Sequence, residues 1–63
     1  MRYEVARGMG DKLSIAIDGL EKEVALLIEK GYVPQGGICV LMEDYADEEY
    51  YWFQAMQAMI KND

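Results

Sequence analysis

The chain can form no internal cross-link, neither a disulfide nor a structural metal site, and this limits its possible folds more than any other feature of the sequence. Its 63 residues include a single cysteine, Cys39, and no histidine, so the chain alone can form neither an internal disulfide nor a structural zinc site. We expect one domain, residues 1–63, which buries only about 60% of the surface that its unfolded chain exposes. Folds this small usually need a disulfide, a metal or a partner. We therefore expect a homo-oligomer, a dimer or larger.

The charge balance and the missing histidine exclude several classes of function. Twelve acidic residues against six basic ones give a net charge of -6, so we expect no direct binding to nucleic acid or to an anionic membrane surface. Without histidine or a metal-ligand cluster we expect no cofactor and no enzyme activity. No run approaches the roughly 18 apolar residues of a membrane span, and no signal peptide is visible. With the free Cys39, this predicts a cytoplasmic protein.

The first half of the chain predicts a strand, a turn and a helix. Residues 2–7 alternate apolar and polar as a half-buried strand does, and the glycines of residues 8–11 predict a turn. A helix is expected over 19–30, with Gly31 as its left-handed cap. The acidic residues near the start of this helix and Lys30 at its end suit the helix dipole. Its expected buried stripe is Leu20, Val24, Leu27 and Ile28.

Residues 12–17 fit two patterns. Leu13, Ile15 and Ile17 alternate as in a strand, yet the same stretch also continues the apolar stripe of the helix that follows it. We favour an extended segment, an extra short strand, because Asp18 and Glu21 have the spacing of a capping box. A glycine inside a helix also costs about 1 kcal/mol relative to alanine.

The second half predicts a connection, a strand and an acidic loop. Residues 32–37, with Pro34, are expected to connect the helix to a strand over 38–42 that is buried on both faces. Cys39 in that strand is expected to be a small buried residue. Residues 43–49 hold five acids and no base and predict a solvated hairpin loop. The final segment, 50–61, has an aromatic start that favours a strand and a Gln-Ala-Met repeat that favours a helix.

Four stretches resemble a known family. They are a Tyr-x-Val strand, a Leu-Glu-Lys-Glu-Val helix that ends in Gly and an aromatic, a Pro-Gln-Gly-Gly-Ile segment and a closing Gln-Ala-Met-Ile-Lys. This order resembles the bacterial and phage family known as domain of unknown function 1737. The matching positions are Tyr3 to Val5, Leu20 to Val24, Gly31 to Ile38 and Gln57 to Lys61.

The resemblance implies an architecture and no activity. It implies an α+β fold, β-α-β-β, with a three-stranded antiparallel sheet, one helix packed on one face, and residues 50–61 as a strand. The family's presence in phages suggests a mobile-element origin. The chain departs from the family in having Tyr32, where Trp is usual, and in its longer link over 8–17.

The aromatic run in the final segment is the strongest candidate for a contact surface. On a strand, Tyr51 and Phe53 share one face and Tyr50 and Trp52 share the other. One helix covers one sheet face, so the second face exposes aromatic and apolar side chains, which favours a partner surface. The candidate interface residues are Tyr50, Trp52, Met56 and Ile60.

A glycine pair is a second candidate. Gly36 and Gly37 precede a strand, where backbone N–H groups could approach a phosphate or carboxylate ligand. A tight connection or a bulge explains the pair more simply.

These features favour a small non-enzymatic protein-interaction module of uncharacterised role that self-associates through its aromatic sheet face. One alternative is a phage-type inhibitor that binds a host protein through its acidic surface. Another is a binder that sequesters a small nucleotide or metabolite at a protomer interface, near Gly36 and Gly37.

Overall fold

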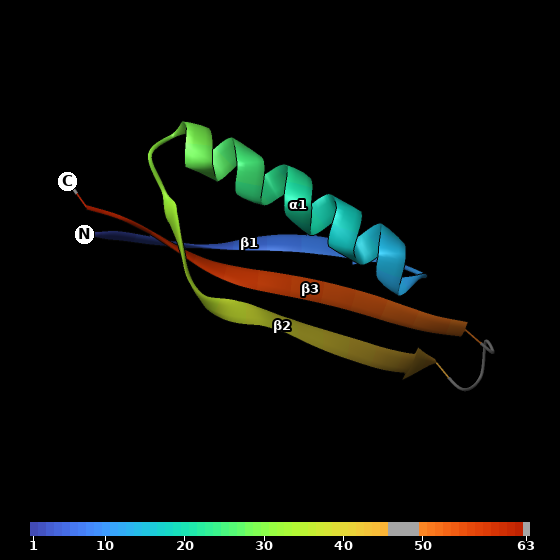
Figure 1. The fold of residues 1–63 in the computed structure, drawn as a ribbon. Coiled ribbons are helices and arrows are strands. Elements are labelled where there is room, and N and C mark those ends of the chain that lie inside the picture. The colour runs from blue at the N-terminus through green and yellow to red at the C-terminus, as the bar shows by residue number, and fades with distance from the viewer. Residues whose placement is uncertain (46–49, 63) are drawn as a thin grey trace.

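The protein is a three-stranded antiparallel sheet with one helix on one face (Figure 1). The computed structural model describes residues 1–45 and 50–62. The elements follow in the order β1 (Arg2–Gly10), α1 (Leu13–Glu29), β2 (Val33–Tyr45) and β3 (Tyr50–Lys61). The strand order is β1-β3-β2, so the last strand lies in the centre. The expected α+β fold with a β-α-β-β order is confirmed.

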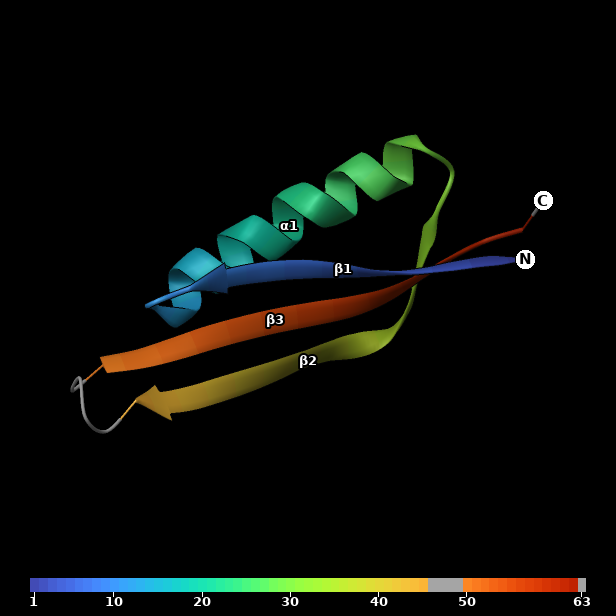
Figure 2. The ribbon, with the colours of Figure 1, turned by 180° about the vertical axis from the view of Figure 1, so that it is seen from behind.

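Strand β3 pairs antiparallel with both neighbours along nearly its whole length. Its helix-favouring Gln-Ala-Met repeat is overridden, because a central strand gains backbone pairing and cross-strand contacts on both sides. Arg2 pairs with Lys61, so the two ends of the described chain lie side by side (Figures 1 and 2).

Strand β1 is longer than its sequence pattern indicates. The turn expected over 8–11 is wrong, because β1 continues to Gly10 and only Asp11 and Lys12 connect it to the helix. Ala6, Gly8 and Gly10 are buried at alternate positions. A Cβ at Gly8 would overlap the carbonyl oxygen of Ala16 and the amide nitrogen of Leu20. The glycines therefore allow the helix backbone to lie directly on β1 rather than forming a turn.

Helix α1 begins six residues before the predicted start at residue 19. The extended segment expected over 12–17 is wrong, and so is the capping box, because Asp18 lies inside the helix. Lys12 occupies the N-cap position without a side-chain hydrogen bond, and no acidic residue lies in the first turn. Nor does a basic residue lie in the last turn. The early start places Ala16 and Leu20 in the core, and this burial outweighs the missing cap.

The helix ends as expected at Gly31, whose φ is +96°. The amide of Gly31 donates to the carbonyl of Ile28 at 2.9 Å, and the amide of Tyr32 donates to that of Leu27 at 2.9 Å. This pair of bonds defines a Schellman motif. Tyr32 is buried, and the Lys61 ammonium lies 5.9 Å from the centre of its ring.

Strand β2 begins at Val33, so the connection expected over 32–37 is largely strand, interrupted by a bulge between Gln35 and Cys39. The prediction that 38–42 is buried on both faces is wrong, and Cys39 is exposed. On the helix side the reason is geometric, because α1 lies over β1 and β3 and barely touches β2, which is an edge strand (Figure 2). Cys39 is exposed because it faces away from α1, on the side that no described element covers. Glu43 continues the strand rather than opening an acidic loop. Residues 46–49 of that expected loop lie outside the described residues.

The core between α1 and the sheet is small. Within the described part of the chain, three of its seven buried hydrophobic residues are alanines. Of the helix stripe that we expected to be buried, Leu20 and Leu27 are buried and Val24 partly so, whereas Ile28 is exposed. The buried hydrophobic residues are Ala6, Ala16, Leu20, Leu27, Tyr32, Ala55 and Met59.

Candidate functional site

The sheet face away from α1, called the open face below, is covered by no element that the structure describes. Residues paired across antiparallel strands point to the same face, and successive residues alternate. Ala6, Gly8 and Gly10 face the helix, so Tyr3, Val5 and their cross-strand partners face the other way. The apolar residues of the open face are Tyr3, Val5, Met9, Val33, Cys39, Leu41, Trp52, Met56, Ala58 and Ile60.

The register places three of the four predicted interface residues together on the open face. Ile60 pairs with Tyr3 and Met56 with Arg7, and Trp52 follows at the same alternation along β3. All three are half-buried within one copy of the chain, whereas Tyr3 is 63% exposed. The side chain of Tyr50 lies outside the described residues.

The open face carries little charge. Arg7 from β1 and Glu43 from β2 are its two charged residues among the described side chains, and their charges cancel. The Gln54 Nε2 donates to the Glu43 Oε1 at 3.0 Å across the β2–β3 pair. Most of the net charge of -6 therefore lies outside this face.

The glycine pair lies at the bulge of β2, where Gln57 is the one residue of β3 opposite three residues of β2. Gly36 has a φ of +76°, a backbone conformation that glycine adopts at little cost. The Gln57 Nε2 donates to the carbonyl oxygens of Gln35 at 3.2 Å and Gly36 at 3.0 Å. It also donates to that of Ala58 at 3.1 Å. The side chain of Gln57 thus replaces the ladder bonds that the bulge interrupts.

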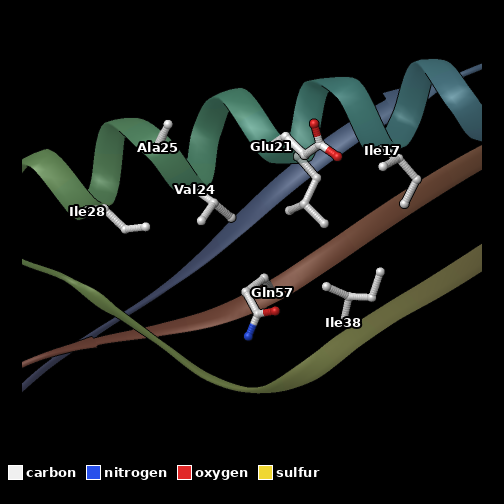
Figure 3. A pocket seen from close by; sticks show the side chains of 8 residues that line it. Ile17, Glu21, Val24, Ala25, Ile28, Ile38 and Gln57 are labelled. Atoms are coloured by element: carbon white, nitrogen blue, oxygen red, sulfur yellow. The ribbon is translucent and has the colours of Figure 1, made fainter.

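A groove runs between α1 and β2, on the helix side of the sheet (Figure 3). It exists because α1 is displaced toward β1 and leaves the inner side of β2 uncovered. Its volume is about 380 Å³, and its lining is apolar apart from Glu21 and Gln57. The other lining residues are Ile17, Leu20, Val24, Ala25, Ile28 and Ile38.

Sequence reasoning placed the aromatic strand correctly but missed this groove and the role of Gln57. A signal for the bulge was present in Gly36 and Gly37. No comparable signal existed for Gln57, because its importance depends on pairing with a segment about twenty positions earlier. Gly36 and Gly37 are not among the residues that line the groove, but Gln57 connects Gly36 to it.

The described residues give no sign of a metal centre or of a membrane span. They contain no group of three or more Cys, Asp or Glu that could hold a metal ion. Within the same part of the chain, no helix has the length and apolar character needed to cross a membrane.

Comparison of the chain with family models, curated proteins and solved structures finds no match. The resemblance to the domain of unknown function family 1737 therefore stays a prediction. The open face and the groove are the two surfaces of the described chain on which a partner or a ligand could bind.

Proposed function

We propose that the protein is a non-enzymatic interaction module that self-associates through its open face. The observation that carries this proposal is the contrast between a small core and a large uncovered apolar face. Five of the fourteen large hydrophobic residues exposed in the described part of one copy lie on the open face. Tyr3, Val33 and Met9 are more than half exposed and lie on the open face. Burying such side chains stabilises a fold by roughly 25 cal/mol per Å² of apolar surface.

The size of the face suits a second copy of the chain. The molecule is elongated, with extents of 47 × 16 × 14 Å. A face of those proportions has an area on the order of 700 Å², close to the about 800 Å² per partner that a standard interface buries. Two such sheets can pack face to face about 10 Å apart as a sandwich. In that arrangement the helices lie on the outside.

Charge also favours contact between two copies through the open face over contact through their other surfaces. Two chains of net charge -6 repel each other wherever their acidic surfaces meet. The charges of Arg7 and Glu43 cancel on the open face, so contact there brings together the least charged part of each copy.

Mass measurement across a dilution series, with Trp52→Ala beside the unchanged protein, tests the proposal. Trp52 lies on the open face, and truncation of a well-packed interface aromatic can cost about 2 kcal/mol or more. We expect the dissociation constant of the oligomer to rise about thirty-fold or more in this variant. A protein that is monomeric at every concentration contradicts the proposal.

Tyr51→Ala is the matched control. Tyr51 is the neighbouring aromatic on the same strand, it is exposed, and it points to the helix side of the sheet. We expect this variant to keep the affinity of the unchanged protein. If both variants weaken the oligomer equally, the open face is not the contact surface. Circular dichroism of each variant establishes that it is folded.

A further inference from the structure

We propose that the groove between α1 and β2 is a binding site for small apolar amines, bound as ammonium ions. The groove lies on the helix side of the sheet and shares no lining residue with the open face. This inference is therefore independent of self-association, and either one can fail without the other.

Gln57 is the residue that points to a ligand. It is 6% exposed, and its Nε2 already donates to the three backbone carbonyls of Gln35, Gly36 and Ala58. Three acceptors around one nitrogen fix the orientation of the amide, so the opposite atom must be Oε1. In Figure 3, Nε2 is directed toward β2 and Oε1 toward Ile38.

The Gln57 Oε1 has no hydrogen-bond donor among the residues that the structure describes. No fully enclosed side-chain nitrogen or oxygen in this part of the chain lacks a partner. Since Oε1 lacks a partner, it is not fully enclosed, and Gln57 is one of the residues that line the groove. A nearly buried acceptor of this kind gains most from a donor that enters from the groove.

The chemistry of the lining selects the ligand. The groove offers an acceptor at Gln57, and no Lys or Arg is among its lining residues. The carboxylate of the exposed residue Glu21 lies at the rim, up on α1 and away from Gln57 (Figure 3). A donor with positive charge is therefore favoured and a carboxylate or phosphate is disfavoured. Val24, Ile28 and Ile38 provide apolar walls (Figure 3). The volume of about 380 Å³ lies within the usual range for small-molecule sites, about 300–1,000 Å³.

Methyl NMR titration with three ligands of equal chain length tests the inference. The probes are octylammonium, octanol and octanoate, which share an apolar tail and differ in their head group. We expect octylammonium to shift the methyl signals of Val24, Ile28 and Ile38, octanol to bind several-fold more weakly, and octanoate to leave them in place. Leu41 on the open face serves as the internal reference, and its signal should not move.

Other outcomes of the titration overturn the proposal. Binding of octanol as tight as that of octylammonium contradicts the preference for an amine. Binding of octanoate as tight as that of octylammonium removes the case for any charge preference. Shifts as large at Leu41 as at Ile38 indicate a detergent effect rather than a site. The absence of shifts with all three probes rules the site out.

A charge-matched pair of variants tests the same proposal without disturbing the bulge. Glu21→Gln removes the rim carboxylate, whereas Glu23→Gln makes the same change of charge at an exposed helix position outside the groove. We expect Glu21→Gln to weaken octylammonium binding about two- to five-fold, the range of an exposed ion pair. Glu23→Gln should change it less. Equal effects of the two variants contradict binding of the ammonium group in this groove.

Discussion

Gly8 of β1 and Gly19 of α1 lie against each other, so that a Cβ placed on Gly19 would be 3.3 Å from the Cα of Gly8. A Cβ placed on Gly8 would overlap the helix backbone at Ala16 and Leu20. Helix and strand therefore meet through backbone atoms at this point. This close approach draws α1 toward β1, and the inner side of β2 stays uncovered as a result.

We expect Gly8→Ala to be among the most damaging single-methyl changes in this chain. The added Cβ has no room unless α1 moves away from β1, and such overpacking costs about 3 kcal/mol. The measurement is urea denaturation at one fixed protein concentration.

Gly37→Ala and Gly19→Ala are the controls for that experiment. A Cβ at Gly37 meets nothing within 4 Å, so this variant should be neutral. At Gly19 the cost of the tight contact is offset by the better helix propensity of alanine, which is worth about 1 kcal/mol. Gly19→Ala should therefore destabilise the protein much less than Gly8→Ala. If Gly8→Ala is as stable as Gly37→Ala, the helix does not lie on β1 as described.

The same glycines show where prediction from sequence fails. Gly8 and Gly10 have the local signature of a turn, and Gly19 that of a helix breaker, yet all three serve close packing between two elements. Local propensity differs by about 1 kcal/mol per residue, which tertiary contacts easily outweigh. The helix end at Gly31 was predictable because a Schellman motif depends only on neighbouring residues.

We expect Gly36→Ala to destabilise the protein by about 1–2 kcal/mol through backbone strain alone, because an L-residue is disfavoured in the left-handed region. Gly36 has a φ of +76° and open space around its Cα. Gly37→Ala is again the control. Gly36→Asn should recover part of the loss, since asparagine tolerates this conformation better. Equal stability of the alanine variants at 36 and 37 in thermal unfolding would rule out the bulge geometry.

Gln57→Ala should cost about 1–3 kcal/mol, because it leaves the carbonyl groups of the bulge without their donor. Gln54→Ala is the same change on the same strand, and it removes only a hydrogen bond to Glu43 on the open face. That loss should stay below about 1 kcal/mol. Chemical denaturation of the two variants compares them directly, and a larger effect at Gln54 would contradict the role of Gln57.

The candidate site was predictable only in part, for a physical reason. Alternation along one strand is a local property, so the shared face of Trp52, Met56 and Ile60 followed from the sequence once β3 was taken as a strand. The burial of Gln57 and the exposure of Ile38 depend on where α1 lies across the sheet. Cys39 is exposed because it lies on the open face. Nothing in the sequence of β2 shows that the helix leaves it uncovered.

Cys39 offers a chemical readout of self-association. It is exposed in one copy and lies on the open face, paired with Met56. Burial of this face should slow its alkylation by iodoacetamide about ten-fold between dilute and concentrated protein, since the thiol is reached only in the dissociated form. In the Trp52→Ala variant the rate should depend far less on concentration. A rate that is independent of concentration in the unchanged protein argues against contact through this face.

Reversing the charge of Arg7 tests why this face, and not another, meets a second copy. Arg7→Glu and Lys22→Glu each change the net charge from -6 to -8, but Arg7 lies on the open face and Lys22 on the exposed side of α1. Both variants add the same long-range repulsion, whereas only Arg7→Glu places uncompensated negative charge inside the contact, where it costs several kcal/mol. Sedimentation at two salt concentrations should show Arg7→Glu as a monomer and Lys22→Glu as an oligomer that recovers with added salt. Equal dissociation of the two variants would mean that overall charge, and not the neutrality of the open face, controls association.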